Sequence, residues 1–144
     1  ILCNQTPLIR GINDHPKTLA TLFRELSFIG VPPYYVFQCR PAFGNKDYAV
    51  PIERGYEIFE QAKSMVSGLA KRAKFVMSHA TGKIEIVGKT EKEVYFKYHR
   101  AANDLDSGRF MVFKSNPQAY WLDDYEEMVC DYPIDQPYQI YGPE

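Results

Sequence analysis

The first half of the chain alternates between strand-like and helix-like hydrophobic patterns. Residues 5–12 have a β-type pattern, and residues 17–29 place apolar side chains three and four positions apart, which is typical of one helix face. Gly30 then follows, at the position where a glycine commonly ends a helix. A second apolar and aromatic run covers residues 34–39, and a second helix is expected over residues 51–65. This strand–helix–strand–helix order predicts an α/β fold with parallel strands.

Three polar residues, Asn13, Asp14 and His15, separate the first strand from the first helix. Aspartate is a preferred N-cap residue, and Pro16 in the first turn loses no hydrogen bond there. We therefore predict that Asp14 caps this helix. Capping also explains these residues without a metal ion, and we predict no metal site in this chain.

From residue 71 onward, short strands follow one another without an intervening helix pattern. The two runs 83–87 and 94–99 alternate apolar and polar residues on either side of a polar turn, which predicts a β-hairpin. The stretch from Trp121 is acidic and aromatic, and we expect it to form an extended tail that wraps a surface. We divide the chain accordingly into residues 1–70, with β/α units, and residues 71–144, a small mainly-β C-terminal extension. Further short strands are expected over 74–77 and 110–113.

Composition and charge narrow the class of protein. The chain has 144 residues and a net charge of −1, so nothing in its charge favours nucleic acid or an anionic membrane as a partner. No apolar run approaches the roughly 20 residues that span a bilayer. Its three cysteines (Cys3, Cys39 and Cys130) lie far apart, which is typical of a reducing compartment and predicts a cytoplasmic protein. The chain begins at Ile1, without a methionine, so we expect it to be a piece of a longer protein.

Two segments carry the candidate chemistry. The first is Pro-Tyr-Tyr-Val-Phe-Gln-Cys-Arg at residues 33–40, and the second is Phe-Val-Met-Ser-His-Ala-Thr-Gly-Lys at residues 75–83. Each is a buried-strand pattern that ends in polar or charged residues, the place where parallel α/β folds expose reactive groups. A lysine directly after a glycine, as at Lys83, is usually a solvated side chain. It can also be the amine that binds an aldehyde cofactor.

Together with residues 5–14 (Gln-Thr-Pro-Leu-Ile-Arg-Gly-Ile-Asn-Asp), these segments resemble the C-terminal half of the lysine 2,3-aminomutase family. The members are radical S-adenosylmethionine (SAM) enzymes that also carry pyridoxal phosphate (PLP). The resemblance implies that residues 1–70 are the last two units of a partial (β/α)6 radical SAM barrel. It also implies that the family's C-x3-C-x2-C motif, which binds the [4Fe-4S] cluster, lies in an N-terminal half outside this chain. We therefore expect that half as a partner and no activity from this chain alone, and we leave a homo-oligomer open.

The resemblance also assigns roles to residues. Lys83 takes the place of the lysine that holds PLP, after a loop of residues 78–82 that is shorter than the family's and keeps one glycine. His79, in that loop, is expected to contact the cofactor or the substrate. Phe37 stands where the lysine enzymes have a tyrosine near the cofactor.

Two further positions bear on substrate specificity. Lysine-specific members have an aspartate at each of them. This chain has Arg40 at the first position. At the second it has Ser78, or Met77 if the gap in the alignment is placed differently. Glutamate-specific relatives also have a basic residue at the first place. Because a guanidinium pairs with a carboxylate and repels an ammonium group, we predict a substrate side chain that is acidic or neutral. The alternative is that Arg40 pairs with an internal acid and never contacts substrate.

The sequence thus predicts part of an amino-acid 2,3-aminomutase, an isomerase that is not specific for lysine. A different class remains open, because the loop before Lys83 has lost glycines. The fold could be inherited by a radical SAM relative without mutase chemistry, or by a non-catalytic binding module.

Overall fold

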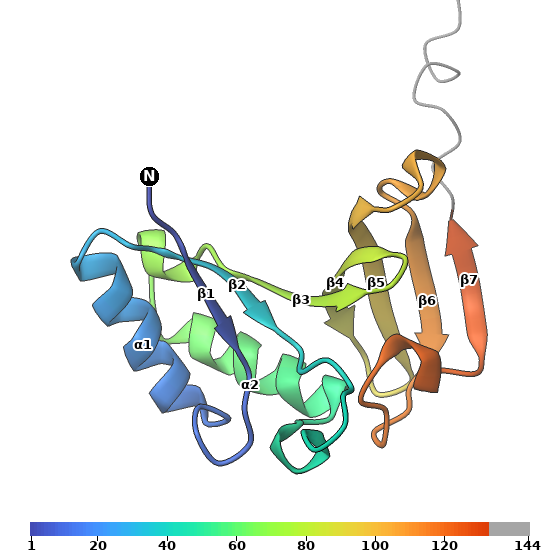
Figure 1. The fold of residues 1–144 in the computed structure, drawn as a ribbon, viewed down its shortest axis with the longest axis horizontal. Coiled ribbons are helices and arrows are strands. Elements are labelled where there is room, and N and C mark those ends of the chain that lie inside the picture. Colours follow the sequence, from blue (N-terminus) through green and yellow to red (C-terminus); the bar gives the residue numbers. More distant parts are fainter. Residues whose placement is uncertain (133–144) are drawn as a thin grey trace, which may run out of the picture.

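The computed structural model describes residues 1–132, which form one open sheet of seven strands together with two longer helices (Figure 1). The strands lie in the sheet in chain order, from β1 to β7. Their bounds are β1 (Asn4–Pro7), β2 (Pro33–Phe37), β3 (Lys74–His79), β4 (Gly82–Lys89), β5 (Glu93–Ala101), β6 (Phe110–Lys114) and β7 (Met128–Tyr132). The helices are α1 (Pro16–Phe28) and α2 (Ile52–Ser64).

The sheet changes from parallel to antiparallel at β3. β1, β2 and β3 run parallel, with Thr6 opposite Val36 and Val36 opposite Phe75. From β3 to β7 each strand pairs antiparallel with the next. The α/β class is therefore confirmed, and so is the hairpin, which is β4 and β5. The sequence pattern did not indicate that β3 pairs with β2 as a third parallel strand.

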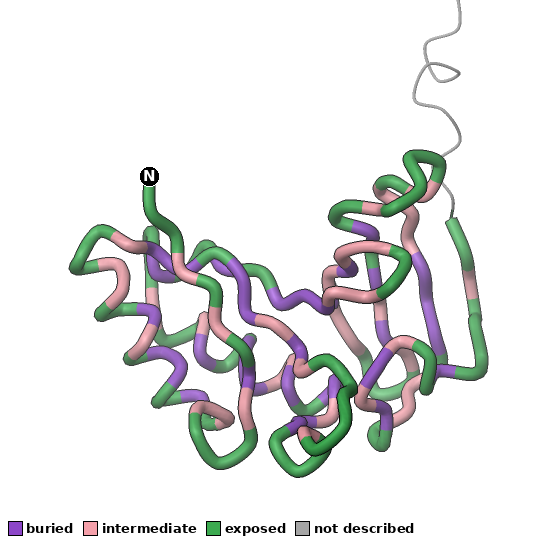
Figure 2. The backbone as a smooth tube through the Cα atoms, viewed as in Figure 1, coloured by how far each residue is buried: buried purple, intermediate pink, exposed green. Residues whose placement is uncertain are grey.

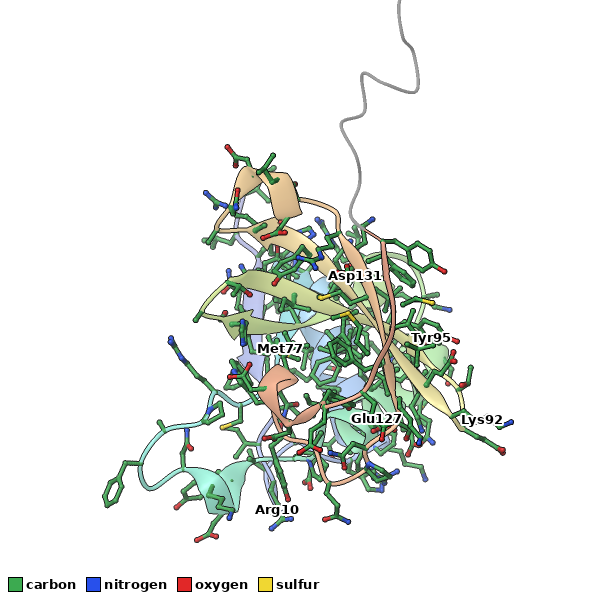
Figure 3. The ribbon with its side chains drawn as sticks, turned by 90° about the vertical axis from the view of Figure 1, so that its right-hand side faces the viewer. Arg10, Met77, Lys92, Tyr95, Glu127 and Asp131 are labelled. Atoms are coloured by element: carbon green, nitrogen blue, oxygen red, sulfur yellow. The ribbon has the colours of Figure 1, made fainter. Side chains whose placement is uncertain are left out.

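The acidic and aromatic stretch after Trp121 is more regular than an extended tail. It includes β7, which pairs with β6, and most of β7 is exposed (Figure 2). Figure 3 views the molecule from this end, with Asp131 of β7 and Tyr95 of β5 labelled. The rest of the predicted tail lies outside the described residues. In the part of the chain that the structure describes, no helix is long and apolar enough to cross a membrane.

The first helix is confirmed, but the prediction that Asp14 is its N-cap was wrong. His15 is the cap, and its Nδ1 accepts a hydrogen bond from the backbone N–H of Lys17 at 3.3 Å. Asp14 instead accepts from the backbone N–H of Gly11 at 2.9 Å. Its carboxylate stabilises the preceding turn and is therefore not available to the helix.

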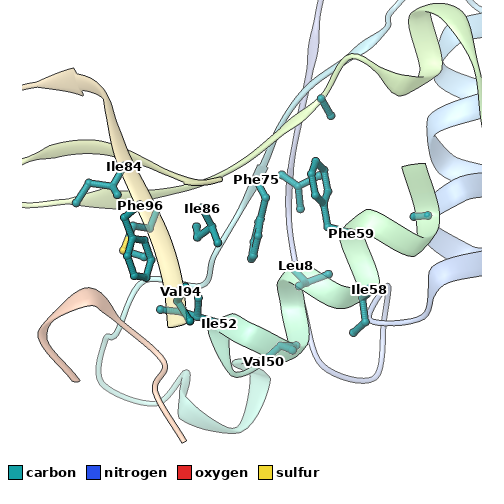
Figure 4. Packing of buried hydrophobic residues seen from close by; sticks show 14 of the residues in the cluster. Leu8, Val50, Ile52, Ile58, Phe59, Phe75, Ile84, Ile86, Val94 and Phe96 are labelled. Carbon is teal, nitrogen blue, oxygen red and sulfur yellow. The ribbon is translucent and has the colours of Figure 1, made fainter. Parts of the chain in front are cut away.

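Both helices pack through aromatic residues that lead from α1 to the sheet. Phe23 of α1 meets Phe59 of α2 edge to face at 6.3 Å between ring centroids, and Phe59 lies 5.7 Å from Phe75 of β3 (Figure 4). Gly55 allows this approach, because a Cβ atom there would lie 3.0 Å from side-chain atoms of both Leu8 and Phe75. A glycine that weakens the isolated helix thus permits close packing of α2 on the sheet.

A buried carboxylate joins α2 to the C-terminal part of the chain. Glu53, only 4% exposed, lies in the first turn of α2. Its oxygens accept hydrogen bonds from the hydroxyl of Ser115 at 2.5 Å, the backbone N–H of Asn116 at 2.8 Å and the hydroxyl of Tyr125 at 3.2 Å. Burial, followed by the nearby charge of Glu53, raises the pKa of Tyr125 well above its usual value, so this tyrosine keeps the proton it donates.

We predict that Glu53→Ala lowers the free energy of unfolding by about 2–4 kcal/mol, because one buried donor (Tyr125) and two partly buried donors lose their acceptor together. The measurement is chemical denaturation of the full-length protein. The matched control is Glu57→Ala on the same helix, where a half-exposed carboxylate pairs with Lys89 and less than about 1 kcal/mol is expected. Equal effects of the two substitutions would contradict the role given to Glu53.

Candidate functional site

The amine of Lys83 lies on an aromatic surface formed by β2. Its Nζ is 4.2 Å from the ring centroid of Tyr35 and 5.4 Å from that of Phe37. Successive side chains of a strand point to opposite faces, and Val36, between these two rings, belongs to the core. Tyr35, Phe37 and Lys83 therefore share the sheet face away from α1 and α2, which we call the open face.

The turn before Lys83 is tighter than the loop predicted over residues 78–82. Ser78 pairs with Lys83 and His79 pairs with Gly82 across β3 and β4, so that only two residues remain between the strands. Gly82 has a φ of 137°, and a Cβ atom there would lie 2.4 Å from the carbonyl oxygen of Arg100. The single remaining glycine is thus needed where the backbone of β5 comes close.

A histidine from β5 completes the group on the open face. Nε2 of His99, on β5, lies 2.7 Å from the hydroxyl of Tyr35, and the two rings meet edge to face. Burial raises the pKa of Tyr35 to about 12. The pKa of His99 is lowered, first by desolvation and then by the charge of Lys74. The tyrosine therefore remains protonated near neutral pH and can donate to an unprotonated histidine.

Arg40 and His79 lie elsewhere, in a cavity of about 1040 Å³ at the carboxyl ends of β2 and β3. Nε2 of His79 is 2.7 Å from a carboxylate oxygen of Asp123, and Nδ1 is 2.7 Å from the hydroxyl of Thr81. The ring of His79 also lies 5.9 Å from that of Trp121. Both Trp121 and Asp123 come from more than 40 residues downstream, and no sequence motif pointed to them.

The walls of this cavity carry opposite charges. Arg40 and Lys46 line it from the loop after β2, while Asp123 and Glu126 line it from the segment before β7. Arg40 is exposed and makes no ion pair with any residue from 1 to 132. The alternative that Arg40 pairs with an internal acid therefore has no support in the described part of the chain.

Buried Gln38 connects the two walls. Its Nε2 donates to the carbonyl oxygen of Val50 at 2.7 Å and to that of Tyr120 at 3.0 Å. Its Oε1 has no hydrogen-bond partner among the described atoms. Gln38 thus fixes the loop after β2 relative to the segment that carries Asp123.

The residues predicted from the sequence fall into two groups. Lys83 and Phe37 meet on the open face, with Ser78 opposite Lys83 in the sheet. Arg40 and His79 meet around the cavity. Within residues 1–132, no three or more His, Cys, Asp or Glu side chains are grouped so that they could hold a metal ion.

Comparison with known proteins finds relatives of this chain. No family model matches the chain. A protein of Aquifex aeolicus (strain VF5), provisionally named L-lysine 2,3-aminomutase, is 60% identical over 131 residues, or 91% of this chain. The L-lysine 2,3-aminomutase of Fusobacterium nucleatum is 39% identical over 69 residues, and the glutamate 2,3-aminomutase of Clostridioides difficile is 38% identical over 69 residues. Each of these two matches covers 48% of the chain. The chain is thus homologous to proteins named lysine 2,3-aminomutase, which confirms the resemblance.

The chain is much shorter than these relatives. It spans 35% of the length of the Aquifex protein and 16% of the lengths of the other two. The relatives include enzymes named for lysine and for glutamate, so the family alone does not determine the substrate.

We predict that His99 titrates below its usual pKa of 6.5 in the folded protein. The folded state then binds fewer protons than the unfolded chain as the pH falls through that value, so acid favours unfolding. The measurement is an NMR titration of isotope-labelled histidine rings, with His99→Gln to assign the signal. Lys74→Gln should raise the pKa of His99, and Lys92→Gln, at the far turn of the hairpin, should not. A wild-type pKa of 6.5 or above would contradict the prediction.

Proposed function

We propose that this chain is the C-terminal part of a radical SAM, PLP-dependent amino-acid 2,3-aminomutase, an isomerase that moves an amino group between neighbouring carbons. The observation that carries the proposal is the Lys83 amine on the aromatic surface of the open face, in a chain of this family. Residues 1–70 would contribute the last two β/α units of a partial (β/α)6 barrel, and residues 71–144 the PLP lysine and the β-rich extension. The three parallel strands β1, β2 and β3 are compatible with such a barrel.

The residues on the open face fit a pyridoxal group. Lys83 offers a primary amine to an aldehyde, and Phe37 offers a partly exposed ring against which a flat heterocycle can pack. When bound, PLP would stabilise an unpaired electron next to the migrating nitrogen. Lys83 would bind the cofactor between turnovers, and Phe37 would orient it and exclude water.

The chain does not provide a site for the iron–sulfur cluster. Its three cysteines lie at positions 3, 39 and 130, and a [4Fe-4S] cluster needs thiolates gathered on one site. We therefore propose that the cluster and SAM are bound by the N-terminal half of the same protein. We also propose that the enzyme acts in the cytoplasm.

We propose a substrate whose side chain ends in an anion or a neutral polar group. Arg40 lines the cavity and has no ionic partner among the described residues, and Lys46 adds a second positive charge to the same wall. An ammonium group beside two unpaired cations would be repelled, whereas a carboxylate would be bound by charge-assisted hydrogen bonds. Ser78, opposite Lys83 in the sheet, would contribute its hydroxyl to the substrate from the open face.

We predict that PLP becomes covalently attached to Lys83 in the full-length protein. Borohydride reduction followed by peptide mass spectrometry should find a phosphopyridoxyl group on the peptide that contains Lys83. Lys83→Ala should abolish this adduct and leave the iron–sulfur absorbance unchanged, because only the reacting amine is removed. Lys97→Ala, a change on the neighbouring strand β5, is the control and should keep the adduct.

Lack of an adduct on Lys83 in the wild-type protein would refute the assignment. That result would favour the second class, a relative without mutase chemistry or a binding module. The observation that keeps this class open is the turn before Lys83, which is only two residues long and is followed by a single glycine, Gly82.

We predict that the full-length enzyme prefers glutamate or aspartate to lysine under reducing conditions with SAM. Arg40→Gln should lower kcat/KM for glutamate about tenfold, which corresponds to about 1.4 kcal/mol. Lys46→Gln, the other cation of the same wall, should have a smaller effect, because Lys46 lies further along the loop. Efficient turnover of lysine by the wild-type enzyme would show that Arg40 does not face the substrate.

A further inference from the structure

The extension after Lys83 adds to the open face a contact that neither the family resemblance nor the substrate argument assigns. β5 pairs with β4 and brings Arg100 opposite Lys83. The residue before it, His99, reaches over β3 and β4 to the hydroxyl of Tyr35 on β2, at 2.7 Å. Side chains from three strands therefore meet in one group: Tyr35, Lys83 and His99.

Each of these three side chains has a different position in the group. Tyr35 is 5% exposed and lies against Phe37, with ring centroids 5.6 Å apart, so its ring is a fixed surface. Nζ of Lys83 lies 4.2 Å from the centroid of that ring, within the range of a cation–π contact. His99 is exposed, and within residues 1–132 its side chain forms one hydrogen bond, with the hydroxyl of the same tyrosine.

We propose that Tyr35 and His99 are a positioning pair for Lys83: His99 fixes the ring of Tyr35, and the ring face holds the Lys83 amine on the open face, ready for a carbonyl compound. The inference rests on the proposed function only for the identity of that carbonyl compound. This proposal gives the β-rich extension a role in the site, because His99 of β5 orients the side chain of Tyr35 on β2.

Charge around the pair is consistent with this role. Lys74, Lys83 and Lys97 surround His99 and act against its protonation, while Glu85 acts in the opposite sense. An unprotonated His99 accepts the hydrogen bond of Tyr35 and adds no positive charge beside the amine. A glutamine at position 99 would keep an acceptor without a charge, whereas a leucine would remove it.

The test uses the reactivity of Lys83 in the full-length protein, without and with PLP. Competitive labelling with acetic anhydride, resolved by peptide, measures how accessible each lysine amine is. Tyr35→Phe and His99→Leu should raise the labelling of Lys83 about twofold to tenfold, the range expected from one lost hydrogen bond, and leave Lys89 and Lys114 unchanged. The same two variants should slow the attachment of PLP to Lys83 by a similar factor.

Two controls separate positioning from general damage. His99→Gln should restore both rates to the wild-type values, and Tyr95→Phe removes a tyrosine hydrogen bond on the same strand, to Glu93, and should change neither rate. Unchanged labelling of Lys83 in both Tyr35→Phe and His99→Leu, or a rise for every lysine alike, would overturn the proposal. If labelling responds as expected but PLP never attaches, the pair is supported and the proposed function fails instead.

Discussion

The candidate site depends on a carboxylate buried at the start of α2. Gly55 lets α2 pack tightly on the sheet, which fixes the position of Glu53 two residues earlier. Glu53 accepts hydrogen bonds from Ser115, Asn116 and Tyr125, and these bonds hold the segment that follows β6. Because buried donors without an acceptor are costly, this segment has few alternative positions. It carries Trp121 and Asp123, and it places both against His79.

The change of direction at β3 separates the two groups of candidate residues. Parallel strands bring the ends of β2 and β3 to the same edge of the sheet, where the cavity lies. The antiparallel return of β4 then places Lys83 on the open face, where its amine lies over the ring of Tyr35 on β2. Neighbouring residues of a strand point to opposite faces, so Ser78 and His79 belong to different surroundings although they are adjacent in sequence.

The extension contributes to both groups, although the resemblance to the family is carried by residues 5–83. β5 brings His99 to Tyr35, and the segment after β6 brings Asp123 to His79. The Aquifex relative matches 91% of the chain, while the other two relatives match 48%. The additional contacts thus come from residues beyond those that carry the resemblance.

The sequence by itself determined the α/β class, both helices, the β4–β5 hairpin and the resemblance to lysine 2,3-aminomutases, because each depends on local periodicity or on short motifs. It also pointed to Lys83 and Arg40, which stand next to recognisable strand ends. Only the tertiary structure decided that β3 continues the parallel sheet and that Asp14 caps a turn instead of α1. It also decided that His99 meets Tyr35 and that Asp123 meets His79. These contacts join residues 44 and 64 positions apart, and their distances depend on the register of a whole sheet, which local patterns do not encode.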